Sequence, residues 1–294
     1  MSDILVRGNS MDGAIRVFCA ITTELVNEAH TIHDTNPVAS AALGRLLTGA
    51  VLMGAAGLKN ESDSLTLQIN GDGPLGRLVA VTDSSLNVRG YVHNPYVDLP
   101  LNSRGKIDVG GGVGVGDLSI IRDLGLKEPY IGRIPLVSGE IAEDLTYYYA
   151  KSEQIPTAIA LGVLVDTDNS IKAAGGYMIQ LMPEATDDMA KRLEEIIAGL
   201  PPVTEMIDSG MDVMDIAFRV TQGFSMLLEN KTVTPAYKCK CSRERMEKAL
   251  ISIGKDELED IIREQGQAEI CCQFCNGKYT FDKAELEELL EKAK

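Results

Sequence analysis

The stretch "AEICCQFCNGKYTF", residues 268–281, places Cys272 and Cys275 in a C-x-x-C pair that is followed at once by Asn-Gly. A second pair, Cys239 and Cys241, forms a C-x-C, and thirty residues separate it from the first. The pattern is compatible with a disulfide, a thioredoxin-like redox centre or a metal site. The sequence around the four cysteines favours one of these.

The segment between and after the pairs predicts a small module. Apolar residues at helical spacing predict one helix that ends at Gly254 and a second that ends at Gly266. The runs "AEICC" and "KYTF" predict a β-hairpin with the C-x-x-C at its tip. Asp282 and Glu285 have the spacing of a capping box for a final helix. The helical hairpin is therefore expected to bring the two cysteine pairs together.

Four thiolates from two short-spaced pairs suit a closed tetrahedral zinc site, with Cys239, Cys241, Cys272 and Cys275 as ligands. A thioredoxin-type centre needs its C-x-x-C at the start of a long helix, whereas a strand pattern follows here. A fortuitous grouping of cysteines is the remaining alternative. We expect one zinc ion in the reduced protein, worth an apparent ~10–16 kcal/mol to the folding of a module with a limited core. Because thiolates react with peroxides, oxidation should release the zinc and unfold the module.

The composition bounds the class of protein. The chain has 294 residues, 45% of them hydrophobic and 24% charged, which is typical of a globular protein with one large domain or two to three smaller ones. Its net charge of −15 argues against general binding to nucleic acid or to an anionic membrane.

One segment, residues 38–58, is apolar and long enough to span a bilayer. Arg45 lies inside it, and an unpaired Arg at membrane depth is costly, so we expect a buried core helix instead. Residues 1–13 contain no long apolar run behind a basic start, so no secretory signal is expected. These features predict a cytoplasmic protein, in which thiols stay reduced and paired cysteines indicate metal or redox chemistry.

The chain is expected to have three parts and an α+β fold. Residues 1–177 form a mixed N-terminal domain with antiparallel sheet and helices, because strand and helix patterns do not alternate regularly. Hairpins are predicted around "NSMDG" and "DTDN". Residues 178–230 form a helical linker, and residues 231–294 form the zinc-binding module.

The linker is acidic and rich in methionine. Residues 177–230 contain ten acidic and three basic residues and seven of the eleven methionines. Thr186 is expected to cap its first helix. The methionines either fill gaps in a core or form an adaptable surface that binds many partners. Because the linker is short and charged, it should be the least stable part of the chain.

Other motifs carry weaker signals. The run "GGGVGVG", residues 110–116, fits neither dinucleotide nor Walker patterns and predicts a flexible turn. His30 and His33 are expected on a solvated helix face, and Cys19 as a buried small hydrophobe in an apolar strand. No nucleophile–base pair or acid pair is evident in the sequence, so no enzymatic activity is expected.

The chain resembles the thirty-three-kilodalton redox-regulated heat-shock chaperone family over essentially its whole length. The resemblance rests on the C-x-C and C-x-x-C spacing and on three segments of the first domain. These segments are "NGDGPLG", "RDLGLKEPYIGRIPLVSGEIAEDLTYYYAKSEQIP" and "AAGGYMIQLMP".

The resemblance implies a stress-response holdase that needs no ATP and is inactive when reduced and zinc-bound. It implies that Cys239 pairs with Cys241 and Cys272 with Cys275 on oxidation. It also implies that the linker then unfolds and that the protein forms a homodimer and holds unfolding client proteins. Cys271 is the one oddity, and strand alternation should point it away from Cys272.

Two alternatives to a chaperone remain open. One is a zinc module that binds nucleic acid, although residues 231–294 hold twelve basic and thirteen acidic residues and thus no strong positive footprint. The other is a thiol oxidoreductase.

Overall fold

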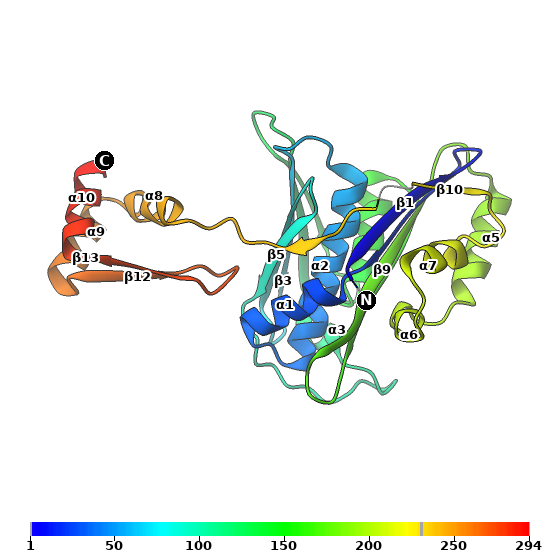
Figure 1. The fold of residues 1–294 in the computed structure, drawn as a ribbon, viewed down its shortest axis with the longest axis horizontal. Helices are drawn as coiled ribbons and strands as arrows, with labels where there is room; N and C mark the ends of the chain where they lie inside the picture. The colour runs from blue at the N-terminus through cyan, green and yellow to red at the C-terminus, as the bar shows by residue number, and fades with distance from the viewer. Residues whose placement is uncertain (1, 230–231, 294) are drawn as a thin grey trace. The chain divides into compact units, whose positions relative to one another are not determined.

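The computed structural model describes residues 2–229 and 232–293, which divide into two compact units, Met1–Lys238 and Cys239–Lys294 (Figure 1). Both units combine helices with sheets, and the α+β prediction is confirmed. The predicted three-part division stays a prediction. Its first boundary, after residue 177, falls inside a strand that runs from Ile171 to Leu181, and its second, between residues 230 and 231, lies outside the described residues.

The larger unit contains two sheets. The first sheet is antiparallel throughout and has the order β10 (Met226–Leu228), β1 (Ile4–Ser10), β2 (Ile15–Ile21), β9 (Ile171–Leu181) and β8 (Thr157–Val165). The second has the order β11 (Ala236–Tyr237), β5 (Asn87–Val92), β4 (Arg77–Asp83), β3 (Ser64–Gly71), β6 (Gly116–Asp123) and β7 (Tyr130–Pro135). Both predicted hairpins are confirmed, as β1–β2 and β8–β9.

A long helix, α2 (Pro37–Gly57), packs against both sheets and forms the layer between them (Figure 1). Pro37 starts it at a position where the missing N–H costs nothing. Its small residues permit close packing: a Cβ added to Gly49 would lie 2.7 Å from Leu145 Cδ1. Among the described residues, α2 is the one helix long and apolar enough to cross a membrane, and 89% of its most apolar window is buried inside the protein. The predicted core helix is therefore confirmed.

Four shorter helical segments complete this side of the larger unit. They are α1 (Thr23–His33), α3 (Val109–Val113), α4 (Ala142–Tyr148) and the π-helical turn η1 (Tyr149–Glu153). The prediction of a turn over residues 110–116 was wrong in part, because its first residues lie in α3. The Asp108 side chain accepts a hydrogen bond from Gly111 N and caps this short helix.

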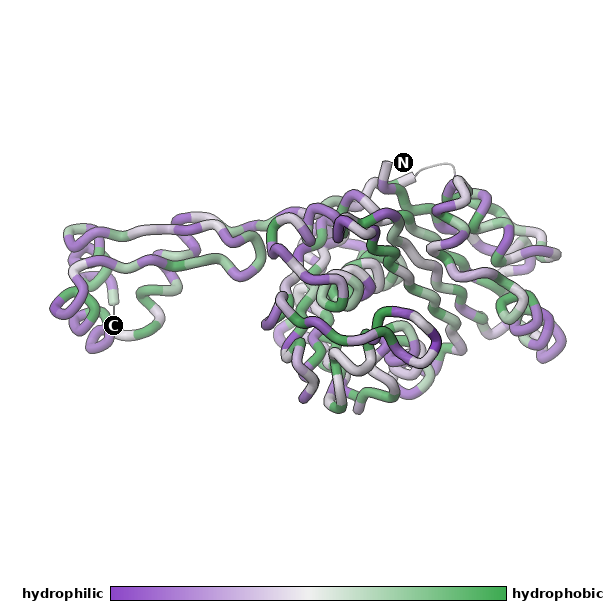
Figure 2. Tube along the Cα trace, turned by 90° about the horizontal axis from the view of Figure 1, so that it is seen from below, coloured by the Kyte–Doolittle hydropathy of each residue, from purple (hydrophilic) through white to green (hydrophobic). Residues whose placement is uncertain are grey.

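Three helices cover the other face of the first sheet: α5 (Asp187–Ala198), α6 (Val203–Asp208) and α7 (Val213–Val220). Thr186 caps α5 as predicted, with its hydroxyl accepting from Met189 N. The apolar sides of these helices form a second core with alternate residues of β2, including Val17 and Cys19. In Figure 2 the sheet strands of the larger unit are largely hydrophobic, whereas hydrophilic colour concentrates in peripheral helices and turns.

The smaller unit contains a two-stranded sheet and three helices. They are α8 (Arg243–Ile253), α9 (Lys255–Glu264), β12 (Gln267–Cys271), β13 (Lys278–Asp282) and α10 (Lys283–Lys292). The two helices end near Gly254 and Gly266 as predicted, and Asp282 and Glu285 form the predicted capping box. The buried core is small and consists of Leu250, Leu258, Phe281, Leu286 and Leu289.

The expectation that both histidines of α1 face solvent was wrong. His33 is 7% exposed, and its Nε2 lies 3.1 Å from the hydroxyl of Tyr237. That hydroxyl also donates to Gly90 O at 2.8 Å. Helical spacing placed His30 and His33 on one face, but the return of residues 236–237 to the edge of β5 buried that face.

Candidate metal centre

Each cysteine pair lies next to the end of a helix or strand of the smaller unit. Cys239 and Cys241 lie in the extended segment before α8, which begins at the Ser242 cap. Cys272 follows β12 directly, and Cys275 lies in the turn before β13.

The turn that carries the C-x-x-C is fixed by its own backbone. Cys272 N donates to Gly277 O at 2.9 Å, and Asn276 N donates to Cys272 O at 2.8 Å. Asn276 has a φ of 55°, the left-handed conformation that Asn tolerates better than most residues. The Asn-Gly that follows the pair therefore closes the turn rather than starting a helix.

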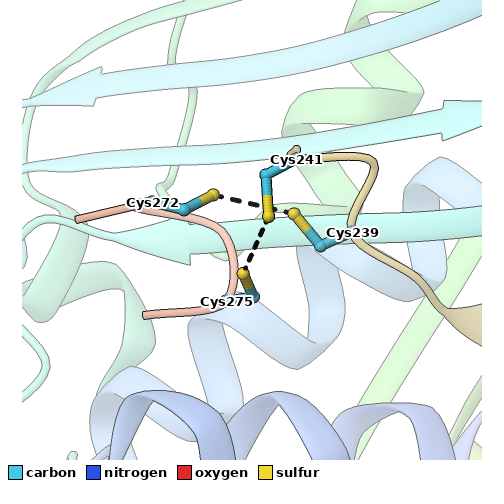
Figure 3. Close-up of side chains that lie close together, drawn as sticks. All are labelled: Cys239, Cys241, Cys272 and Cys275. Carbon is cyan, nitrogen blue, oxygen red and sulfur yellow. Dashed lines mark hydrogen bonds between the residues drawn. The ribbon is translucent and has the colours of Figure 1, made fainter. Parts of the chain in front are cut away.

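The four thiols converge on one point (Figure 3). Cys239 Sγ lies 3.6 Å from Cys272 Sγ, and Cys241 Sγ lies 3.4 Å from Cys275 Sγ. All four sulfur atoms lie within 4.8 Å of one another. Four sulfurs bound at 2.3 Å to a tetrahedral zinc would lie about 3.8 Å apart. The cluster can therefore hold a metal ion, and its size and donor set fit a four-thiolate centre.

Burial and hydrogen bonds to sulfur shift the pKa values of Cys239, Cys241 and Cys275 in different directions. Partial burial acts to raise the pKa of Cys241, but hydrogen bonds from the Tyr279 hydroxyl and from neighbouring thiols outweigh it and lower that pKa to about 7. Burial raises the pKa of Cys239 and of Cys275, although backbone N–H groups of Cys241 and Gly277 donate to their sulfurs. The hydrogen bond to Cys241 raises the pKa of Tyr279 to about 12. A bound metal would hold all four sulfurs as thiolates.

The other two cysteines lie outside the cluster. Cys271 is exposed at the end of β12, while its neighbour Cys272 is buried. Cys19 is fully buried in β2, where burial raises the pKa of its thiol. Neither contributes a sulfur to the four-thiol group.

The position of the C-x-x-C argues against thioredoxin-like chemistry. Cys272 and Cys275 lie between two antiparallel strands, β12 and β13, and not at the N-terminus of a helix. The dipole of a helix N-terminus, which lowers the pKa of a thioredoxin-type thiol, is thus lacking at this pair.

The family model described as "Hsp33 protein" matches residues 3–282 of the chain. The chain belongs to the Hsp33 family. It is 48% identical over 295 residues to a 33 kDa chaperonin of Clostridium beijerinckii, with 100% of each sequence covered. It is 49% identical over 291 residues to a 33 kDa chaperonin of Acetivibrio thermocellus, covering 99% of this chain and 98% of the relative.

A solved Hsp33 structure has the same fold. The crystal structure of the 33 kDa chaperonin from Thermotoga maritima matches with a TM-score of 0.92 and 41% identity, and 99% of each chain is covered. The family name and the names of these relatives support a chaperone. The resemblance that the sequence motifs indicated is confirmed.

The four cysteines that the sequence predicted would meet do lie together, and their role as metal ligands stays a prediction. The sequence analysis missed one side chain beside them. Tyr279 lies on β13, and its hydroxyl is 3.1 Å from Cys241 Sγ. Its place two residues before the buried Phe281 puts it on the same face of β13, so the sequence indicated only a strand residue that faces the core. Nothing local in the sequence connects it with a cysteine 38 positions earlier.

Proposed function

We propose that the chain is a redox-regulated, ATP-independent chaperone that holds unfolding proteins when it is oxidised. The observation that carries the proposal is the group of four thiols within 4.8 Å of one another, drawn from two cysteine pairs. Membership of the Hsp33 family supports the chaperone half of the statement. The thiol group supports the redox half, because thiolates are what peroxides attack.

The proposed resident metal is one zinc ion, bound by Cys239, Cys241, Cys272 and Cys275 in the reduced state. Zinc suits a closed set of four thiolates and would act structurally there. The core of the smaller unit has only five buried side chains, so the metal would supply a large part of the stability of this unit. Loss of the metal is therefore expected to unfold this unit.

Oxidation would remove the ligands in pairs. The family resemblance favours disulfides Cys239–Cys241 and Cys272–Cys275, each formed as two thiolates give two electrons to an oxidant such as hydrogen peroxide. The nearest sulfur pairs are instead Cys239–Cys272 and Cys241–Cys275. Peptide mapping of the oxidised protein distinguishes the two pairings, and the second would contradict our assignment.

The proposed client-binding surface is the face of the first sheet under α5–α7, together with the apolar sides of these helices. That interface contains Met206 and, around its edge, several partly buried methionines. Met side chains repack around different shapes, so the surface suits clients of varied sequence. We further propose that the active form is a homodimer and that it acts in the cytoplasm.

Zinc content and aggregation suppression, measured side by side on reduced and oxidised protein, test the function. Reduced protein should hold one zinc per chain and suppress aggregation weakly, while oxidised protein should hold none and suppress it strongly without nucleotide. Hydrogen exchange adds the mechanism: peroxide with mild heat should deprotect residues 178–294 and leave most of residues 1–177 protected. Full activity with a protected 178–230 segment would exclude linker unfolding.

Two control assays address the alternatives. Turnover in an insulin-reduction assay would support an oxidoreductase instead. A salt-dependent mobility shift with DNA or RNA would support the nucleic-acid module. We expect neither, because the C-x-x-C is placed between strands and residues 231–294 carry nearly balanced charge.

A further inference from the structure

Tyr279 connects the two halves of the four-thiol group. It lies on β13 opposite Ile270 of β12, and its ring packs against the core of the smaller unit. Its hydroxyl extends to Cys241 Sγ, 3.1 Å away, in the other cysteine pair. The hairpin that carries Cys272 and Cys275 therefore also supplies a donor to the C-x-C segment.

This donor differs in kind from the backbone donors of the site. The Cys239 sulfur accepts from the N–H of Cys241, and the Cys275 sulfur accepts from the N–H of Gly277. Both of these bonds stay within one short turn and persist whatever side chains surround them. The bond from Tyr279 to Cys241 depends on one side chain and on the correct packing of the hairpin against the C-x-C segment.

A hydrogen bond to a thiolate withdraws negative charge from the sulfur. Charge-assisted bonds of this kind are about twice as strong as neutral ones. A thiolate with less charge is a weaker nucleophile. Partners that orient metal ligands from outside typically change metal affinity by 10–100-fold when they are removed. The Tyr279 hydroxyl is therefore placed to change how fast the Cys241 sulfur reacts without itself being a ligand.

We infer that Tyr279 is a positioning residue of the metal centre whose hydroxyl slows the attack of Cys241 on peroxide and so sets the oxidation threshold of the switch. The inference rests on the proposed function, since it assumes that peroxide acts on a metal-bound thiolate group. The Cys241 sulfur forms a bond to one peroxide oxygen, the O–O bond breaks, and hydroxide leaves with its electron pair. A second thiolate then attacks the Cys241 sulfur, forms the disulfide and displaces a second hydroxide, so that two thiolates and one hydrogen peroxide give one disulfide and two hydroxide ions.

The test compares full-length Tyr279→Phe with the wild type. The change keeps the ring and its packing and removes the hydroxyl. A chromogenic zinc chelator follows zinc release after addition of hydrogen peroxide, and we expect release to be roughly tenfold faster in the variant. Tyr130→Phe is the matched control, because Tyr130 is an exposed tyrosine of the larger unit, and it should release zinc at the wild-type rate. Equal release from Tyr279→Phe and the wild type overturns the proposal.

A second measurement separates a hydrogen bond from a packing effect. Reduced protein loaded with cobalt has sulfur-to-metal charge-transfer bands that respond to hydrogen bonding at sulfur. Tyr279→Phe should bind one cobalt per chain and shift these bands to longer wavelength, while Tyr130→Phe should not. An unchanged spectrum, or a variant that no longer binds one cobalt, overturns the proposal, because a hydroxyl that only adjusts Cys241 is not needed to assemble the site.

The cobalt experiment also keeps the two proposals apart. It needs no peroxide and no client protein, so it decides the role of Tyr279 even if wild-type protein proves resistant to oxidation. Resistance of the wild type, combined with a band shift in Tyr279→Phe, would refute the proposed redox function and leave the hydrogen bond established.

Discussion

The two faces of the first sheet are covered in very different ways. On one face, α2 buries sixteen of its 21 residues between the two sheets. On the other, α5 buries one of twelve residues, Leu193, while α6 and α7 bury three of six and four of eight. The same sheet thus separates a thick, aliphatic core from a thin cover of short helices.

The difference predicts where the chain can open without losing its fold. Apolar area removed from water contributes roughly 25 cal/mol per Å², so a layer that buries few side chains is held by a small free energy. Segments with few buried contacts are the ones that unfold locally. We therefore expect α5–α7 to detach while the layer formed by α2 stays intact, and the following four experiments test this, from the largest expected effect to the smallest.

The largest effect should come from the metal ligands. Cys272→Ser should lose the metal and unfold the smaller unit, at an apparent cost of the order of 10 kcal/mol. Hydrogen exchange should show residues 239–294 exposed and α2 still protected. Cys271→Ser, one residue away and exposed, is the matched control and should keep one zinc per chain. Equal zinc loss in both variants would mean that the ligand assignment is wrong.

A cavity made in α2 should lower the stability of the larger unit more than a cavity made in α5, and it should affect more of the chain. Leu47→Ala in α2, where Leu47 is 0% exposed, should lower the free energy of unfolding of the whole larger unit by about 3–5 kcal/mol. Leu193→Ala in α5 should cost about 2 kcal/mol or less, because short surface helices can settle into the gap. Urea unfolding measures the first loss and hydrogen exchange of α5–α7 the second. Similar global losses would contradict the comparison.

An extra methyl group at Gly162 should loosen the packing of α6 on the first sheet without oxidation. A Cβ added to Gly162 of β8 would lie 2.6 Å from Thr204 Cγ2 and 2.9 Å from Val203 Cγ1, both on α6. Gly162→Ala should therefore cost about 1–3 kcal/mol in the docking of α6. In the reduced, zinc-loaded state, the Gly162→Ala variant should suppress aggregation more than the wild type does.

The control for this experiment is Gly57→Ala at the end of α2, where an added Cβ meets nothing within 4 Å. It should leave both stability and reduced-state activity unchanged. If Gly162→Ala loosens α6 in hydrogen exchange and activity stays at the wild-type level, undocking of α6 does not expose the client-binding surface.

The smallest effect should come from a helix cap. Asp212 accepts hydrogen bonds from Met214 N and Asp215 N at 2.8 Å and caps α7. Asp212→Ala should cost about 1 kcal/mol of local stability and raise exchange in α7. Glu195→Ala, which removes one negative charge from an exposed position in α5, should have less effect. Equal hydrogen exchange of α7 in the two variants would show that net charge, and not capping, controls the local stability of α7.

Local features of the fold were predictable because their causes are local. The turn residues of "NSMDG" and "DTDN" predicted the two hairpins that β1–β2 and β8–β9 form. The Thr186 cap and the helix end at Gly254 likewise follow from neighbours within a few residues. The cysteine spacing predicted the thiol group for the same reason, since the members of each pair are only two or three positions apart.

Contacts between distant segments were not predictable in this way. The parallel pairing of β11 with β5 joins residues about 150 positions apart. The two-residue sequence of β11, Ala236–Tyr237, contains no pattern that predicts this pairing. That pairing buries His33 against Tyr237, which is why the prediction of a solvated histidine face was wrong.

The sequence by itself determined that this chain has an α+β fold, a buried small-residue helix and two cysteine pairs whose four thiols lie together. Each of these depends on periodicity, composition or spacing over a few residues. Only the tertiary structure decided that α5–α7 cover one face of a sheet whose other face packs on α2, and that Tyr279 reaches Cys241. These contacts join segments far apart in sequence, and their partners are chosen by how the whole chain buries its apolar surface.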